Sequence, residues 1–263
     1  MRSSLLLVAA LAMPSVADAD IAISAAPAVI DAPVDVGRTA EGTVHLANIG
    51  SDPVTIHTYV QDWWYTPGGA LTFPAAGASP RSAASWVSVR DREFQLAPGA
   101  SRKVELLLAV PPDARGGHYA VVFFEAGDAH LSATGAMKVG VNGRLGVLVA
   151  HHDPARSAPA LAVSGVAATV TPDEGTRIAV ELDVTGDVHA TPTGSAVIVD
   201  AAGRVIGKVA LTPSGASTLL PGQRGRLTGE LARALPPGRY EALVSVSYFA
   251  GKAVATKTAF VVP

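Results

Sequence analysis

The sequence of 263 residues contains no cysteine and is poor in charged residues. Without cysteine the chain can form no disulfide, no thiolate metal site and no cysteine nucleophile. Charged residues make up 16 % of the chain and hydrophobic residues 49 %, which excludes an intrinsically disordered protein. The 20 lysines and arginines nearly balance the 22 aspartates and glutamates and form no basic run, which argues against nucleic-acid binding.

Residues 1–19 have the pattern of an export signal. Arg2 supplies a positive charge, residues 5–13 are apolar, and Ala17-Asp18-Ala19 fits the small-x-small cleavage pattern. The apolar stretch is much shorter than the roughly 20 residues of a membrane span, so we expect a cleaved signal peptide and not an uncleaved anchor. We predict a periplasmic protein, with the cell surface as the alternative location, and no transmembrane segment in the mature chain.

Two parts of the chain repeat one order of signals: a Pro-Gly turn, a strand-like run, a Pro-Pro pair and a Gly-x-Tyr triplet. The first copy has Pro98-Gly99, Pro111-Pro112 and Gly117-His118-Tyr119. The second copy has Pro221-Gly222, Pro236-Pro237 and Gly238-Arg239-Tyr240. We therefore predict a tandem repeat of one domain type, with domains at residues 20–152 and 160–263 and a proline-stiffened linker at 153–159.

The spacing of apolar residues is that of β-strands. Apolar and polar residues alternate from Val54 to Val60, and glycine- and proline-rich turns separate short runs of this kind. A tyrosine after glycine at the start of a late strand is typical of the tyrosine corner of immunoglobulin-like domains. We predict an all-β fold of two tandem immunoglobulin-like β-sandwich domains after the cleaved signal peptide.

The sequence contains little that points to catalysis. It has neither a Gly-x-Ser-x-Gly nor a His-Glu-x-x-His motif, and its acidic residues are scattered. His151-His152-Asp153 could ligate a metal, but two or three distant ligands would still be required, so we interpret it as a solvated linker edge. The other histidines are expected in surface or turn positions: His45, His57, His118, His130 and His189. We predict no enzymatic activity, no metal and no cofactor.

An aromatic cluster follows the strand that begins at Val54. If the strand continues, adjacent Trp63 and Trp64 point to opposite faces, and Trp64 is in phase with the apolar positions. We therefore assign Trp64 to the core, and expect Trp86 in the interior as well. The predicted outer face is an aromatic surface for glycan or protein binding, unless neighbouring side chains cover it, and consists of His57, Tyr59, Trp63 and Tyr65.

A long alternating run between residues 137 and 149 is a second candidate site. At a sheet edge, its unpaired backbone could accept a strand of another protein. The alternative is an interior strand whose apolar side chains are buried in its own domain. The candidate partner-strand residues are Met137, Val139, Val141, Arg144, Leu145 and Val147.

Several motifs resemble the amino-terminal domain of periplasmic pilus-assembly chaperones. They are Asn48-x-Gly50 with Pro53-Val54, Ser85-Trp86-Val87, Leu96-x-Pro98-Gly99, and residues 111–119. A similar pattern occurs in Gram-positive WxL-interacting surface proteins, whose second domain resembles residues 186–194 with Asp200-x-x-Gly203. The resemblance covers nearly the whole mature chain and implies the immunoglobulin-like fold.

The chaperone resemblance also implies a site for a subunit's terminal carboxylate, held by Arg on the first strand and Lys on the last strand of domain one. Residues 27–31 contain no Arg, and Gly146 stands at the expected Lys position. Arg144 lies two residues earlier and can bind a carboxylate through two parallel hydrogen bonds.

We therefore predict a non-catalytic periplasmic chaperone-like protein that binds an extended segment of an envelope or pilus subunit by β-strand pairing. The alternative is a secreted cell-envelope or adhesion module that binds glycan or a surface protein through the aromatic face of domain one. In both cases the partner is an exported protein or an envelope component and not a nucleic acid.

Overall fold

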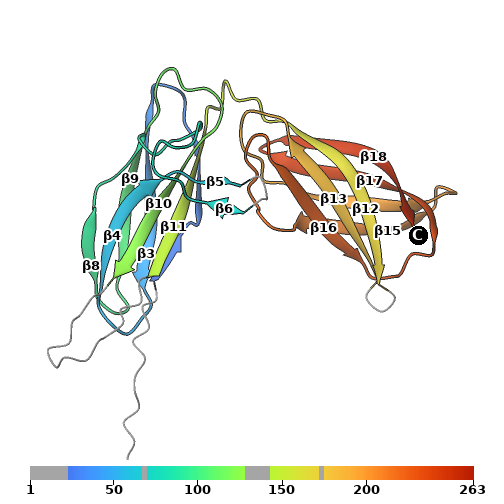
Figure 1. Cartoon of the computed structure of the whole chain (residues 1–263), viewed down its shortest axis with the longest axis horizontal. Helices are drawn as coiled ribbons and strands as arrows, with labels where there is room; N and C mark the ends of the chain where they lie inside the picture. Colours follow the sequence, from blue (N-terminus) through green and yellow to red (C-terminus); the bar gives the residue numbers. More distant parts are fainter. Residues whose placement is uncertain (1–22, 67–69, 128–142, 172–174) are drawn as a thin grey trace, which may run out of the picture.

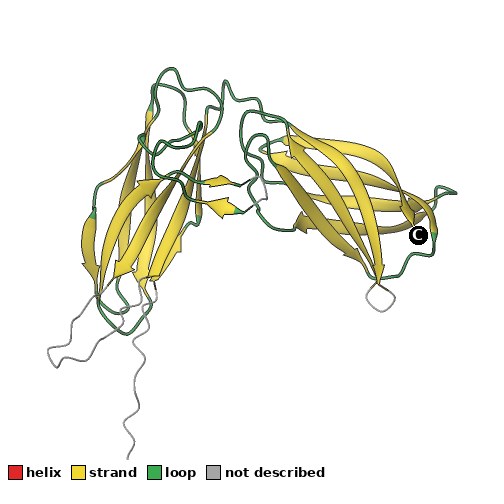
Figure 2. Ribbon diagram, viewed as in Figure 1, coloured by secondary structure: helices red, strands yellow, loops and turns green. Residues whose placement is uncertain are grey.

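The computed structural model describes residues 23–66, 70–127, 143–171 and 175–263. The expected signal peptide and residues Met137, Val139 and Val141 lie outside these ranges. The described residues form strands and loops only (Figure 2), which confirms the predicted all-β fold. No helix in these ranges could cross a membrane.

The first β-sandwich packs a four-stranded sheet against a five-stranded sheet (Figure 1). The four-stranded sheet has the order β1 (Ile23–Ala26), β3 (Thr39–Asn48), β9 (Ser101–Ala109), β7 (Val87–Val89). The five-stranded sheet has the order β2 (Val29–Pro33), β11 (Gly143–His152), β10 (His118–Gly127), β4 (Val54–Gln61), β8 (Glu93–Leu96). The chain therefore passes from one sheet to the other between β1 and β2.

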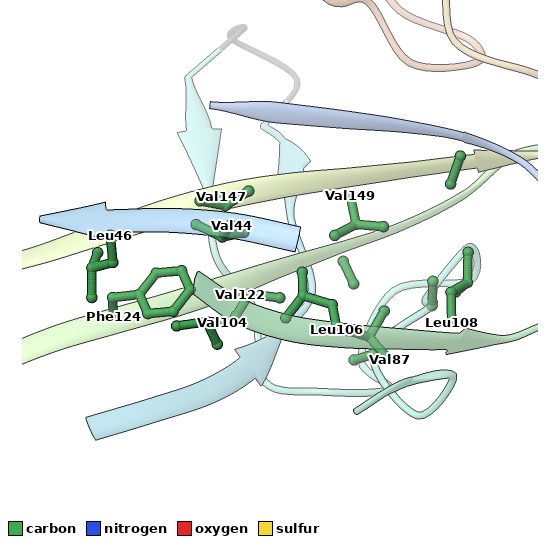
Figure 3. Packing of buried hydrophobic residues seen from close by; sticks show 14 of the residues in the cluster. Val44, Leu46, Val87, Val104, Leu106, Leu108, Val122, Phe124, Val147 and Val149 are labelled. Carbon is green, nitrogen blue, oxygen red and sulfur yellow. The ribbon is translucent and has the colours of Figure 1, made fainter. Parts of the chain in front are cut away.

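The core of this sandwich lies between the two sheets (Figure 3). Val104 and Leu106 of β9 face Val122 and Phe124 of β10, and all four side chains are buried. Successive side chains of a strand point to opposite faces, so one face of each sheet supplies the core. This alternation is the pattern that the sequence shows in these segments.

The second sandwich contains seven strands in the order β12 (Leu161–Thr171), β13 (Gly175–Val184), β16 (Arg224–Leu231), β15 (Val205–Pro213), β14 (Thr193–Asp200), β17 (Gly238–Phe249), β18 (Lys252–Val262). β15 joins the two layers, because its first part pairs with β14 and its last two residues, Thr212 and Pro213, pair with β16. The buried alternate side chains of both layers form a separate core.

The repeated sequence signals occupy corresponding places in the two sandwiches. Each Pro-Gly turn precedes a strand, β9 or β16, and Gly99 and Gly222 have φ of +70° and +79°. Each Pro-Pro pair precedes the strand that carries the Gly-x-Tyr tyrosine. The hydroxyl of Tyr240 donates to the carbonyl oxygen of Pro236 at 2.9 Å, which is the bond of a tyrosine corner.

A small hairpin of β5 (Trp64–Tyr65) and β6 (Leu71–Thr72) extends from the first sandwich toward the second (Figure 1). The hydroxyl of Tyr65 donates to the carbonyl oxygen of Thr218 at 3.0 Å. Leu220 of the second sandwich is fully buried in an apolar cluster with Trp63, Tyr119 and other residues of the first. These contacts hold the two sandwiches together.

Candidate functional site

The candidate site is the edge of the five-stranded sheet at β11. β11 pairs with β10 from Gly143 to His151. On its other side, β2 pairs in parallel with Leu148–His152 only. Within the part of the chain that the structure describes, no strand pairs with Gly143–Val147 on that side. Among the described residues, half of β11 is therefore an open edge.

The backbone hydrogen bonds of β11 show which residues face this edge. The N–H of Leu148 donates to the carbonyl oxygen of Ala28 at 3.0 Å, on the β2 side. In an antiparallel ladder both backbone groups of every second residue point to the same side. Arg144 and Gly146 therefore direct their N–H and C=O groups toward the open edge, whereas Leu145 and Val147 bond to β10.

The side chains of β11 have a different orientation from the one expected for partner contact. Val147 is fully buried in the core of its own sandwich, and Leu145 is half-buried on the same face. The expectation that the Val147 side chain contacts a partner is wrong, because the sheet must bury this face against β3 and β9. Arg144, on the opposite face, is exposed.

Arg144 lies on an aromatic surface of the sheet. Its guanidinium carbon is 4.4 Å from the ring centroid of Phe123 and 5.8 Å from that of Phe73. Nη1 of Arg144 is 3.4 Å from the hydroxyl of Tyr59, which donates to Glu125 at 3.0 Å. Attraction between the cation and the ring faces holds the guanidinium beside the open edge.

The outer face of the sheet also explains the glycine at position 146. A Cβ at Gly146 would lie 2.9 Å from Cγ2 of Val121 and 3.0 Å from Cε1 of Phe123. Both distances are shorter than ordinary carbon–carbon contacts of about 3.5–4.0 Å. A lysine at this position would therefore require these two side chains to move.

The predicted aromatic surface is wrong at Trp63. This side chain is fully buried, and its Nε1–H donates to the carbonyl oxygen of Val149 at 3.2 Å. β4 ends at Gln61, so its alternation does not extend to Trp63. Trp64, which we assigned to the core, is only half-buried in β5.

The other residues of that predicted surface do not form one exposed platform. His57 is exposed and its Nδ1 lies 3.4 Å from a Glu93 carboxylate oxygen. Tyr59 is half-buried against Phe123, with ring centroids 5.3 Å apart. Tyr65 is half-buried and bonds to the second sandwich.

The histidine cluster before the linker is buried, so its interpretation as a solvated edge is wrong. His151 is fully buried, and Asp153 accepts backbone hydrogen bonds from Ala155, Arg156 and Val36. The pairing of β2 with β11 covers this segment, and His189 and Phe249 of the second sandwich pack against His152.

Two of the histidines contact one carboxylate. Oδ1 of Asp31 is 3.1 Å from Nδ1 of His152 and 3.5 Å from Nε2 of His189, which is buried and not at the surface as expected. Burial of Asp31 would raise its pKa, but its hydrogen bonds to the two histidines outweigh burial and hold the pKa well below its usual range. The sequence gives no sign of this contact because the three residues are far apart in the chain.

No protein-family model matches the sequence, and no curated protein matches it. The chain is similar to solved structures of fimbrial chaperones. The class 5 fimbriae chaperone CfaA has a TM-score of 0.47 and 14 % identity over 92 % of this chain and 100 % of that chain. The structure of the Salmonella enterica SafA pilin in complex with the SafB chaperone has a TM-score of 0.44 and 10 % identity, covering 94 % of this chain and 99 % of that chain. The E. coli chaperone DraB has a TM-score of 0.44 and 10 % identity, covering 92 % of this chain and 98 % of that chain.

Proposed function

We propose that this protein is a non-catalytic, periplasmic, chaperone-like protein that binds an extended segment of an exported envelope or pilus subunit by strand pairing. The observation that carries the proposal is the open half of β11. β2 pairs with Leu148–His152 only, so the backbone groups of Arg144 and Gly146 remain available among the described residues. An added strand gains affinity from main-chain hydrogen bonds to such an edge.

In this proposal Arg144 has two roles. Its backbone pairs with the added strand, and its guanidinium binds a carboxylate of the subunit. The rings of Phe123 and Phe73, 4.4 Å and 5.8 Å from the guanidinium carbon, keep this group close to the unpaired edge. Met137, Val139 and Val141 would extend the paired segment beyond Gly143.

The alternative function, a glycan-binding or adhesion module, depended on an outward-facing Trp63. Because Trp63 is buried between the two sandwiches, we do not propose that function. The resemblance of residues 186–203 to WxL-interacting proteins stays a prediction. We also propose a signal peptide at residues 1–19, domains at 20–152 and 160–263, and a linker at 153–159.

Site-specific crosslinking tests the proposed function. Because the chain has no cysteine, a single introduced cysteine can carry a benzophenone label at one known position. The test variant is Ala28→Cys, which is exposed beside the unpaired half of β11 and leaves Arg144 in place. The matched control is Glu93→Cys on β8, which is exposed at the opposite edge of the same sheet.

Each labelled protein is added to a periplasmic extract of the native host, irradiated and examined by mass spectrometry. We expect the label at position 28 to crosslink to an extended segment of an exported subunit, and the label at position 93 to give no such product. Absence of a crosslink at position 28, or equal crosslinking from both edges, would overturn the proposal.

A further inference from the structure

We propose that Asp31, His152 and His189 form a binding site for a divalent transition metal, with Zn²⁺ as its occupant, at the contact between the two sandwiches. Asp31 lies on β2 and His152 is the last residue of β11. His189 lies in the second sandwich, between β13 and β14. The three residues thus come from three separate segments of the chain.

The distances between the ligand atoms fit a small metal ion. One ligand atom from each residue can be chosen so that all three lie within 4.8 Å of one another. Bonds of about 2.0–2.2 Å in a tetrahedral Zn²⁺ site separate neighbouring ligand atoms by roughly 3.3–3.6 Å. The Asp31–His152 distance of 3.1 Å and the Asp31–His189 distance of 3.5 Å are already close to this spacing.

The two imidazole rings are held in place by packing. The side chains of His152 and His189 are 8 % and 4 % exposed. Phe249 packs against both rings, with centroid distances of 4.9 Å to His152 and 5.9 Å to His189. Ligands whose orientations are fixed before binding lose little conformational freedom when the metal binds.

The three side chains are suitable ligands for a Zn²⁺ ion whose fourth coordination position stays open. Two imidazole nitrogens and one carboxylate are ligands that Zn²⁺ accepts, with water as the fourth ligand. The Asp31 side chain is 58 % exposed, so its side of the cluster can admit water. Other first-row divalent ions such as Cu²⁺ and Ni²⁺ suit imidazole ligands too.

The surroundings of His189 limit the affinity that we expect of this site for Zn²⁺. Its Nδ1 is buried and has no hydrogen-bond partner among the residues that the structure describes. Metal-bound histidines usually donate their second ring N–H, and loss of that partner weakens metal binding by about 10–100-fold. We therefore expect weaker binding than in a site with a complete outer shell.

A bound metal would connect β2 and β11 to the second sandwich through coordinate bonds. This connection differs from the proposed strand-pairing site, because Asp31 and His152 lie beyond the open half of β11. The metal site can therefore be tested without any subunit.

The experiment is calorimetric titration of the tag-free, chelator-treated protein with Zn²⁺, with visible absorption of bound Co²⁺ as an independent probe. We expect one ion per chain, a rise in Tm with Zn²⁺ concentration, and a loss of affinity of at least about tenfold in both Asp31→Asn and His189→Gln. These two changes keep the size and polarity of each side chain close to the original.

The matched control is His57→Gln, which alters an exposed histidine that also lies beside a carboxylate, Glu93. We expect it to bind Zn²⁺ like the unaltered protein. The absence of heat and of Co²⁺ absorption would overturn the proposal. Binding that is unchanged in Asp31→Asn and His189→Gln would do the same, since it would assign the ion to other ligands.

Discussion

Arg144 of β11 lies directly opposite Glu125 of β10, and the hydroxyl of Tyr59 connects the two side chains. The hydroxyl accepts from the guanidinium at 3.4 Å and donates to the carboxylate at 3.0 Å. Tyr59 thereby holds Arg144 over Phe123, at the point where β11 has an open edge. The orientation of the proposed carboxylate-binding group thus depends on the neighbouring strands β4 and β10.

The two roles of Arg144 can be separated by two substitutions. Arg144→Ala removes the guanidinium and keeps the backbone N–H. We expect it to weaken binding of the crosslinked subunit roughly ten- to hundredfold, because hydrogen bonds to charged groups contribute about 1.5–3 kcal/mol. Arg144→Pro also removes the N–H at the open edge, and we expect a further loss of roughly fivefold, since a neutral hydrogen bond contributes about 1 kcal/mol.

Proline is tolerated at an edge strand when its missing N–H does not face a neighbouring strand. The measurement is the subunit Kd for both variants, with circular dichroism as the check on folding. Equal affinities of the Ala and Pro variants would contradict strand pairing at this residue.

We predict that Gly146 of β11 tolerates a side chain poorly. Gly146→Ala places a methyl group against Val121 and Phe123, so we expect a loss of about 1–3 kcal/mol in the free energy of unfolding, as for an overpacked core. The control is Gly165→Ala on β12, where the new Cβ would lie 3.9 Å from the nearest atoms of Glu181. We expect its effect to stay within about 0.5 kcal/mol. Urea unfolding measures both, and equal effects would contradict the close packing at Gly146.

Trp63 is predicted to contribute to stability and not to partner binding. Trp63→Ala removes a fully buried ring and its hydrogen bond to Val149, so we expect a loss of about 3–5 kcal/mol in the free energy of unfolding. Tyr65→Phe removes only the hydroxyl that bonds to Thr218, with an expected loss of about 0.5–1.5 kcal/mol. Denaturant unfolding ranks the two variants, and a Trp63→Ala protein as stable as the original would refute the buried position.

We predict that His118 lowers the free energy of unfolding as the pH becomes acidic. Desolvation by burial is the largest influence and lowers its pKa from 6.5 to about 4, although a hydrogen bond to the Gly116 carbonyl opposes the shift. His151 and Arg81 lower it further. Between these two values the unfolded chain binds the proton and the folded chain does not, so stability falls as the pH falls from 6.5 to 4.

The measurement is the free energy of unfolding at several pH values for the original protein and for His118→Gln. We expect a shallower decrease in the variant because glutamine does not titrate. Parallel curves for the two proteins would contradict this prediction, because they would mean that folding does not change the pKa of His118.

The local features of the fold could be predicted from the sequence, because each rests on residues close together in the chain. The Pro-Gly turns before β9 and β16 require left-handed backbone at Gly99 and Gly222, which glycine adopts without strain. The alternation from Val54 to Val60 likewise reflects a strand with one buried face. Such signals establish strands and turns without the partner strand being known.

The parts of the site that were predicted wrongly depend on contacts between distant segments. The end of β4 at Gln61 changes the orientation of Trp63, and Leu220 of the second sandwich completes its surroundings. His152 is buried because β2, more than a hundred residues earlier, pairs with β11. A single sequence contains no periodic pattern that records such pairings.

The pairing of β2 with β11 has a geometric consequence for any chain that adds to the edge. The carbonyl oxygen of Ala28 already accepts the N–H of Leu148, so a foreign strand cannot continue past that residue without displacing β2. In the proposed complex, β2 would therefore limit how far along β11 an incoming strand can pair. The end of the paired segment would then be determined by this protein and would not depend on the sequence of the subunit.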